Sequence, residues 1–393
     1  MRILHTADLH IGKMVNNFSM IEDQKYILKQ MVDSVKAQQA DAFIIAGDVY
    51  DRPIPSAEAV EVFHDFIQKL HETGVEIFCI SGNHDSPERL SFAEEILGEH
   101  GVHFAGTYKE KCKQITLQDT DGPVVFTLMP FVKAAVLGEN TSEEAVRHML
   151  ADSFGTEETA TNERKCLNAV EKSGQRHILI THYFVTNAGR TPELSDSENP
   201  VSVGGLDNVD ASCFKGFAYT ALGHIHKPQQ MNKEGDSLGP VVYAGAPLAY
   251  SFSECGQEKS IVQLDMDREG NVKLQRHALK PLHRMRKIKG RLEEVISPAV
   301  CECFDKEDYL QVTLTDEDEL IDPIGTLRSV YPNVMQLLFD KKEKESSGEY
   351  SVTEMVEKKT TEELFEDFYY LIREKEMDDA RKSVIRDVIK ELA

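Results

Sequence analysis

Residues 42–51 read AFIIAGDVYD, an apolar run that stops at a glycine and is followed by two aspartates. The run Ala42–Ala46 has the length and composition of a buried β-strand, and Gly47 and Asp48 follow it directly. The segments RILHTADLH at 2–10 and EIFCISGNHD at 76–85 repeat this arrangement. Each segment therefore predicts a strand with polar side chains just past its carboxyl end.

Amphipathic stretches separate these strands. Apolar residues recur at helical spacing from Ile21 to Val35 and from Val60 to Leu70, with Ser56 as the N-cap of the second stretch. Such alternation predicts parallel strands joined by right-handed crossovers, and hence an α/β fold. We expect a first set of strands at 2–6, 42–46, 76–80 and 124–129, and a second set at 177–181, 219–222, 241–244 and 260–266.

The remaining segments predict the domain organisation. Residues 139–175 resemble a helical insertion, and the Pro- and Gly-containing stretch 186–208 is a long loop of the kind that often flanks a site. Near residue 276 the composition changes to a basic run, Lys280–Arg291, which indicates a domain boundary. Beyond it we expect a small α+β unit with a strand at 309–314 and a helix at 324–330, then a charged linker and two amphipathic helices.

Composition limits the class of protein. The chain has 393 residues, 28% charged and 41% hydrophobic, and its apolar runs are too short to cross a bilayer. From its first residues we expect no secretory signal, and from its seven scattered cysteines no disulfide framework, so we expect a cytoplasmic protein that does not enter a membrane. The net charge of −23 excludes DNA binding by bulk positive charge, so any affinity for nucleic acid must be local.

Five polar motifs share one position, directly after an apolar strand. They are Asp8-Leu9-His10, Gly47-Asp48-Val49-Tyr50-Asp51, Gly82-Asn83-His84-Asp85, Thr181-His182 and Gly223-His224-Ile225-His226. In open α/β sheets, residues past the carboxyl ends of strands converge on one edge. The motifs offer carboxylates, imidazoles and one amide but no thiolate, which suits manganese, iron or catalytic zinc. Each motif alone is compatible with an ordinary turn, but the placement of all five favours a metal centre.

The number of ligands indicates two ions. The candidate ligands are Asp8, His10, Asp48, Asn83, His182, His224 and His226. This set is too large for one ion with open positions, whereas two ions about 3.5–4 Å apart can share it through a bridging carboxylate. Asp48, which follows a central strand, is the predicted bridge. Two metal ions arranged in this way are suited to phosphoester hydrolysis.

His84 has a different predicted role. It directly follows Asn83, and successive loop side chains seldom reach one ion together. His84 is therefore better placed to protonate the leaving oxygen of a substrate. Asp85 is expected to orient the ring of His84.

The motifs together resemble the calcineurin-like metallophosphoesterases, and narrower features resemble the SbcD nuclease subunits within that superfamily. These features are MRILHTADLHIGK, GDVYDRPIPS, SGNHDSPERL, SVGGLDNV, YTALGHIHKPQ and YAGAPLAYSFSE. The resemblance is strong over about residues 1–290. It implies a two-sheet β-sandwich flanked by helices in a nuclease domain over 1–276. It also implies a small α+β capping domain over 277–340, and a linker with a helical partner-binding tail over 341–393.

The resemblance also implies roles for the site residues. One manganese ion would be bound by Asp8, His10, Asp48 and His226, and the other by Asp48, Asn83, His182 and His224. His84 would assist catalysis, and Mg²⁺, Fe²⁺ or Zn²⁺ are alternative metals. Archaeal and eukaryotic relatives carry a second active-site histidine where this chain has Asp51. Asp51 is left with three interpretations, because it could order a water, order the ring of a ligand or cap the following turn.

The activity implied by the resemblance is that of a manganese-dependent DNA nuclease. It would be a 3′-to-5′ exonuclease on duplex ends and an endonuclease on single strands and hairpins. The resemblance implies an SbcC-type ATPase with a coiled coil as partner, and a homodimer of the nuclease within a heterotetramer. The chain has no P-loop, so any ATP dependence must come from another subunit. Lys13, Asn17 and Arg89 are weak candidates for contacts with DNA, and the run Lys280–Arg291 either touches phosphates or is a solvated surface.

Two alternatives remain open from the residues. A phosphatase or small-molecule phosphodiesterase of the same fold would use the same ligands, although it would not need the hundred or so residues after the catalytic domain. A non-catalytic scaffold would be expected to lack ligands, and none is missing here.

Overall fold

The computed structural model describes residues 1–154, 176–198, 206–233, 238–318 and 320–340, with eight further residues between 365 and 385. Contacts divide the chain into two compact units, Met1–Asp340 and Lys341–Ala393. The predicted helices of the tail and the second half of the predicted insertion lie outside the described residues, apart from those eight. Among the described residues, no helix is long and apolar enough to span a membrane.

The first sheet is built around the strand formed by residues 42–46. Its six strands lie in the order β16-β15-β1-β4-β5-β6. Their bounds are β1 Arg2–Thr6, β4 Ala42–Ala46, β5 Glu76–Ile80, β6 Val102–Ala105, β15 Ser260–Met266 and β16 Val272–Ala278. Strands β1, β4, β5 and β6 are parallel, as the alternation of strands and helices predicts.

The second sheet also has six strands, in the order β13-β14-β12-β9-β8-β7. Their bounds are β7 Lys113–Asp119, β8 Gly122–Leu128, β9 Arg176–Thr181, β12 Tyr219–Leu222, β13 Gln229–Gln230 and β14 Val241–Tyr243. Strands β8, β9, β12 and β14 are parallel. Both sheets therefore present the carboxyl ends of several parallel strands.

The expected division of strands between the sheets is wrong in two places. The strand expected at 124–129 in the first set is β8, Gly122–Leu128, which pairs with β9 in the second sheet. Residues 260–266, expected in the second set, form β15 and pair antiparallel with β1 in the first sheet. The cause is that the chain crosses to the second sheet at the β7–β8 hairpin and returns to the first through β15, and periodicity within a strand carries no information on such crossings.

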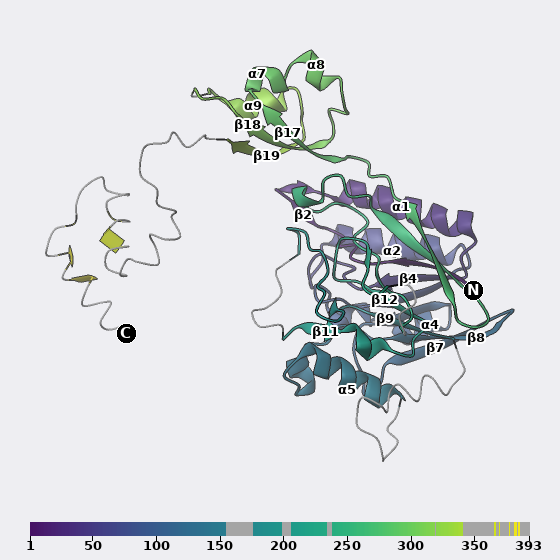
Figure 1. Ribbon diagram of the computed structural model, residues 1–393. Coiled ribbons are helices and arrows are strands. Elements are labelled where there is room, and N and C mark those ends of the chain that lie inside the picture. Colours follow the sequence, from purple (N-terminus) through teal and green to yellow (C-terminus); the bar gives the residue numbers. More distant parts are fainter. Residues whose placement is uncertain are drawn as a thin grey trace. The chain divides into compact units, whose positions relative to one another are not determined.

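Alternate residues of the strands face two different cores. Ile44 of β4, Phe78 of β5 and Phe126 of β8 lie in the apolar layer between the two sheets, where the rings of Phe78 and Phe126 stack 4.1 Å apart. Phe43 and Ile45 face the opposite side, where helices α1 (Ile21–Gln38) and α2 (Ala57–His71) cover the first sheet. Helix α5 (Ser142–Phe154) packs on the outer face of the second sheet (Figure 1). The predicted two-sheet sandwich flanked by helices is confirmed.

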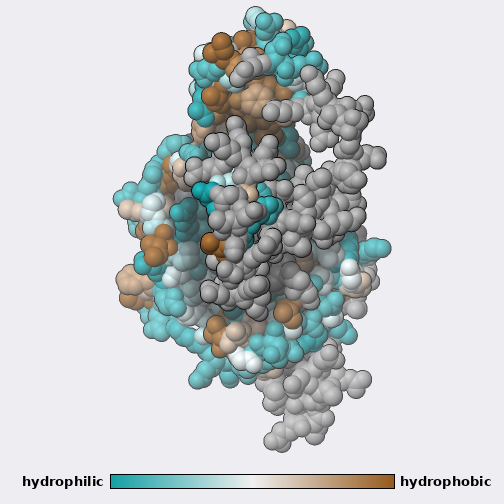
Figure 2. All heavy atoms as spheres, turned by 90° about the vertical axis from the view of Figure 1, so that its left-hand side faces the viewer, coloured by the Kyte–Doolittle hydropathy of each residue, from teal (hydrophilic) through white to brown (hydrophobic). Residues whose placement is uncertain are grey.

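A third sheet follows the sandwich. Strands β17 (Met285–Gly290), β18 (Tyr309–Leu314) and β19 (Val334–Phe339) are parallel, and they share a core with α7 (Leu292–Val295), α8 (Pro298–Cys301) and α9 (Pro323–Arg328). Strand β16 runs to Ala278, two residues past the predicted boundary at 276. On the face seen in Figure 2, apolar residues gather on this small α+β unit, and on the visible part of the larger body smaller apolar groups lie among hydrophilic residues.

Short elements complete the description. They are β2 Met14–Val15, β3 Phe18–Ser19, α3 Pro87–Leu90, α4 Glu94–Gly98, β10 Phe184–Thr186, β11 Asn208–Asp210 and three 3-10 turns at Ala134–Leu137, Ala211–Phe214 and Phe252–Glu254.

Candidate metal centre

Five strand ends from the two sheets supply the predicted ligands. From the first sheet come Asp8 and His10 after β1, Asp48 after β4, and Asn83 after β5; from the second come His182 after β9, and His224 and His226 after β12. The structure brings all seven together, as the expected convergence of strand ends requires.

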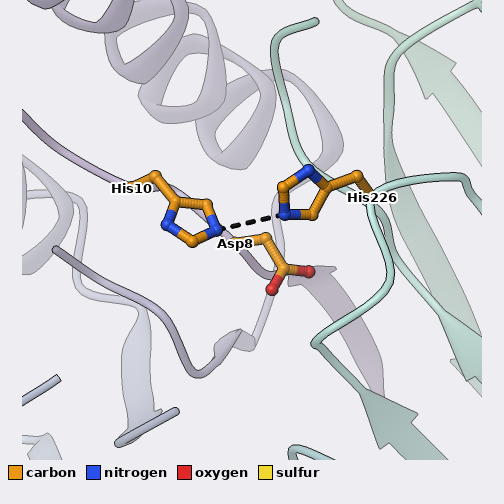
Figure 3. A group of neighbouring side chains, drawn as sticks. All are labelled: Asp8, His10 and His226. Atoms are coloured by element: carbon orange, nitrogen blue, oxygen red, sulfur yellow. Dashed lines mark hydrogen bonds between the residues drawn. The ribbon is translucent and has the colours of Figure 1, made fainter. Parts of the chain in front are cut away.

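The first cluster consists of Asp8, His10 and His226, and all three are buried. The Nε2 atoms of His10 and His226 lie 3.1 Å apart, and the carboxylate of Asp8 lies beside them (Figure 3). The ligand atoms of the three residues lie within 4.8 Å of one another. Such spacing allows one ion to contact all three side chains.

The second cluster consists of Asn83, His182 and His224. Oδ1 of Asn83 lies 3.1 Å from Nε2 of His182 and 2.9 Å from Nδ1 of His224. Asn83 is exposed and His224 is half-buried, so this cluster is open to solvent where the first is closed.

Asp48 lies between the two clusters. Its Oδ2 atom is 3.7 Å from Nε2 of His10 and 3.3 Å from Nε2 of His182. This carboxylate is therefore within reach of both clusters, in the position that a bridging ligand occupies.

The backbone is strained at four of the predicted ligands. Asp8, His10, Asp48 and His224 have φ angles of 54°, 45°, 50° and 96°, in the left-handed region that residues with a Cβ rarely adopt. Such outliers persist only where the surrounding structure enforces them, and they concentrate at functional sites.

Glycines in the motifs make room for the ligands. A Cβ at Gly82 would lie 2.1 Å from Oδ1 of Asp48, and a Cβ at Gly47 would lie 2.4 Å from Nδ1 of His182. A side chain at either position would displace a predicted ligand, which explains why glycine precedes Asp48 and Asn83.

The ionisation of the site follows from burial and neighbouring charges. Burial lowers the pKa of His10 to about 3 and that of His224 to about 4, so both rings are neutral. Burial opposes the charge on His182, but Asp48 and Asp8 beside it raise its pKa to about 9. Burial, with Asp48 close by, raises the pKa of Asp8 to about 8. The site therefore holds protons that a cation would displace.

The donor set fits divalent metal ions. It offers imidazole nitrogens, carboxylate oxygens and one amide oxygen, the ligands preferred by borderline-hard ions. Oδ2 of Asp8 is buried without a hydrogen-bond partner, so this acceptor is available to an ion. Nδ1 of His182 bonds to the carbonyl of Ala46 at 2.8 Å, which directs its Nε2 into the site.

His84 lies beside the first cluster. Its ring meets that of His10 edge-on at 4.8 Å, and its backbone N–H donates to Oδ1 of Asp48 at 2.9 Å. Its Nδ1 lies 2.9 Å from the carbonyl oxygen of Asp51, so Nδ1–H donates and Nε2 is left free. One nitrogen of His84 also lies within 4.8 Å of ligand atoms of His10 and Asp48.

The role expected for Asp85 is wrong. Its carboxylate accepts hydrogen bonds from the backbone N–H groups of Val49, Tyr50 and Gly82, so it ties the loop after β4 to the loop after β5. The backbone carbonyl of Asp51 contacts the ring of His84 in its place, a contact that no side-chain pattern indicates.

The side chain of Asp51 faces the first cluster. Its Oδ1 atom is 3.7 Å from Nδ1 of His10 and forms an ion pair with Nζ of Lys13 at 2.7 Å. Of the three residues considered for DNA contacts, Lys13 is thus already paired, whereas Asn17, in the β2–β3 turn, and Arg89, on α3, are exposed.

Several supporting residues were not predicted. Gln24 of α1 donates to the carbonyl of His10 at 2.7 Å and accepts from the N–H of Gly12, and the hydroxyl of Tyr250 donates to the carbonyl of Leu9. Ser197 contacts the ring of His226, and Glu254 accepts a hydrogen bond from Ser197. Tyr250 and Glu254 lie within the stretch YAGAPLAYSFSE and Ser197 lies within the loop at 186–208, but no spacing pattern indicates that they support the site.

Comparison with known proteins agrees with this architecture. The family described as calcineurin-like phosphoesterase matches residues 1–228, and the SbcD_C family, described as type 5 capsule protein repressor C-terminal domain, matches residues 281–371. The chain is 32% identical over 396 residues to a protein of Staphylococcus epidermidis that is named as the D subunit of the nuclease SbcCD. The match covers 99% of this chain and 98% of that protein.

Two solved structures are more distantly similar. TT1561 of Thermus thermophilus is 14% identical with a TM-score of 0.36, and a dimetal phosphatase from Danio rerio is 8% identical with a TM-score of 0.40. Each match covers 70% of this chain and 98% of the other. The family matches over both parts of the chain and the full-length relative, not these distant likenesses, carry the conclusion. This chain belongs to the SbcD family of calcineurin-like phosphoesterases.

Proposed function

We propose that this chain is a DNA nuclease that hydrolyses phosphodiester bonds with two divalent metal ions, manganese in the first instance. The observation that carries the proposal is the position of Asp48, whose Oδ2 atom lies 3.7 Å from Nε2 of His10 and 3.3 Å from Nε2 of His182. One carboxylate within reach of two separate ligand clusters is what a two-ion site requires.

The ligands divide between two ions. Asp8, His10 and His226 would hold one ion, Asn83, His182 and His224 the other, and Asp48 would bridge them. Bound there, the ions supply the Lewis acidity that activates water and stabilises negative charge on a phosphodiester.

His84 is the proposed proton donor to the leaving oxygen. Its Nδ1–H is held by the carbonyl of Asp51, which fixes the ring and leaves Nε2 to face the substrate. Asp51 thereby acts through its backbone on His84, while its carboxylate lies beside the ring of His10. Of the three interpretations considered for Asp51, orienting the ring of a ligand fits these contacts best.

The substrate and partner follow from the relative. The protein of Staphylococcus epidermidis is named as a subunit of the SbcCD nuclease, which supports DNA as substrate and an SbcC-type ATPase as partner. The finer activity that we propose is 3′-to-5′ exonuclease action on duplex ends with endonuclease action on single strands and hairpins, by a homodimer within a heterotetramer. We assign the capping role to residues 277–340 and binding of the ATPase to residues 341–393.

The test is degradation of a linear duplex, labelled at one 5′ or 3′ end, by the purified chain with Mn²⁺, alone and with the ATPase subunit. His84→Ala and a small phosphodiester, bis(p-nitrophenyl) phosphate, are run beside it. Cleavage of DNA that is lost in His84→Ala is the expected result. Hydrolysis of the small diester with DNA untouched, even with the ATPase present, would move the function to a phosphodiesterase of the same fold.

A further inference from the structure

Residues 193–198 are anchored to Lys227 and Gln229, which follow His226 in the chain, and to Ser253. The backbone N–H of Glu193 donates to Oε1 of Gln229 at 2.9 Å, and its carboxylate pairs with Lys227. The backbone N–H of Asp196 donates to Oγ of Ser253 at 2.8 Å. These contacts place the side chain of Ser197 against the ring of His226.

The hydroxyl of Ser197 lies between an imidazole and a carboxylate. Its Oγ atom is 2.7 Å from Nδ1 of His226 and 2.6 Å from Oε1 of Glu254. A hydroxyl has one hydrogen to donate, and a carboxylate can only accept. Ser197 therefore donates to Glu254 and accepts from His226, so Nδ1 of His226 carries the proton and Nε2 has a free lone pair.

Glu254 is held in place by several donors. It is buried, and its Oε1 atom also accepts from the backbone N–H of Tyr250 and from the hydroxyl of Ser251. Its Oε2 atom accepts from Nζ of Lys259 at 2.5 Å, and the same ammonium donates to the carbonyl of His226 at 3.1 Å. The network therefore contacts His226 at its ring, through Ser197, and at its backbone carbonyl, through Lys259. The ammonium of Lys259 also balances the negative charge of Glu254.

From this geometry we infer that Ser197 and Glu254 are positioning residues that fix the tautomer of His226 and present its Nε2 to the ion of the first cluster. The inference rests on the proposed two-ion site. It extends the site to a segment outside the five strand-end motifs. Partners of this kind around a ligating histidine typically change metal affinity by about 10–100-fold when removed.

The test measures Mn²⁺ binding to the metal-free full chain by isothermal titration calorimetry, without DNA. Ser197→Ala is expected to weaken one of the two sites by roughly tenfold and to leave the other unchanged. Ser197→Thr, which keeps the hydroxyl, is expected to restore the affinity. Long-range ¹H–¹⁵N NMR of the imidazoles should show the Nδ1–H form of His226 in the unsubstituted chain and in Ser197→Thr, and a mixture of tautomers in Ser197→Ala.

The matched control is Ser251→Ala, which removes another hydroxyl bonded to Glu254 but touches no ring. Unchanged affinity in Ser251→Ala beside a loss in Ser197→Ala supports the inference. Equal losses in both variants, or none in Ser197→Ala, would overturn it. Fewer than two ions bound by the unsubstituted chain would overturn both this inference and the two-ion site, whereas two ions bound without cleavage of DNA would overturn the proposed nuclease alone.

Discussion

The two halves of the candidate metal centre are supported in different ways. In the first, Asp8, His10 and His226 are buried, and the ring of His226 is held by the side chain of Ser197, which in turn donates to Glu254. In the second, Asn83 is exposed and the ring of His182 is held by the backbone carbonyl of Ala46. The closed half therefore depends on distant side chains that a substitution can remove, whereas the open half depends on the strand itself.

Removing the shared carboxylate should have the largest effect because it acts on both halves. Asp48→Asn is expected to abolish DNA cleavage, a loss of at least about 10³-fold, since both ions lose their common anionic ligand. End-labelled duplex with Mn²⁺ measures it, with Asp33→Asn, at an exposed position of α1, as the control. Full activity in Asp48→Asn would end the bridged two-ion interpretation.

Loss of His84 should separate metal binding from catalysis. His84→Ala is expected to bind Mn²⁺ as the unsubstituted chain does, with cleavage reduced by about 10²–10⁴-fold because the leaving oxygen has lost its proton donor. His64→Ala, at an exposed position of α2, is the matched control. If calorimetry showed a parallel loss of one ion, His84 would be a ligand of the first half, which its distance from His10 and Asp48 allows.

Each half should release a proton when the ions bind. At pH 7 the metal-free site retains the proton of His182, with a pKa of about 9, and that of Asp8, with a pKa of about 8. Binding of Mn²⁺ at pH 7 is expected to release about two protons, and affinity should rise as pH rises from 7 to 9 because fewer protons compete. Calorimetry in buffers of different ionisation enthalpy counts them.

The variant Asp8→Asn sharpens this prediction, since it should reduce the number of protons released on Mn²⁺ binding by about one. His10 and His224, whose pKa values are lowered to about 3 and about 4, should contribute none in this range. A release that stayed constant from pH 7 to above pH 9 would contradict the assignment of the protons to His182 and Asp8.

The smallest effect is expected outside both halves. Arg89→Ala, on α3 shortly after Asn83 and His84, should weaken DNA binding only slightly. The fall of log affinity with log salt concentration should become less steep by about 1, the effect of one lost phosphate contact. Fluorescence anisotropy over a salt series measures it, with Arg268→Ala, exposed in the β15–β16 turn, as the control. An unchanged slope would remove Arg89 from the DNA surface.

The strands and their polar ends could be predicted from the sequence because they are local. An apolar run such as Ala42–Ala46 followed by Gly47 and Asp48 indicates both where a strand ends and which side chain follows it. Parallel pairing then brings the ends of β1, β4 and β5 to one edge whatever the loops do. The seven candidate ligands and His84 could be named for that reason.

Tertiary structure alone decided which sheet each strand joins and what supports each ligand. Strands β8 and β15 lie in the sheets opposite to those expected, because pairing between distant segments depends on the whole core rather than on periodicity within a strand. The contact from the carbonyl of Asp51 to His84 involves backbone, which every residue has, and so leaves no trace in the sequence. Ser197 meets His226 and Glu254 only through folding, because the partners of a hydrogen bond are chosen by position in space and not by separation along the chain.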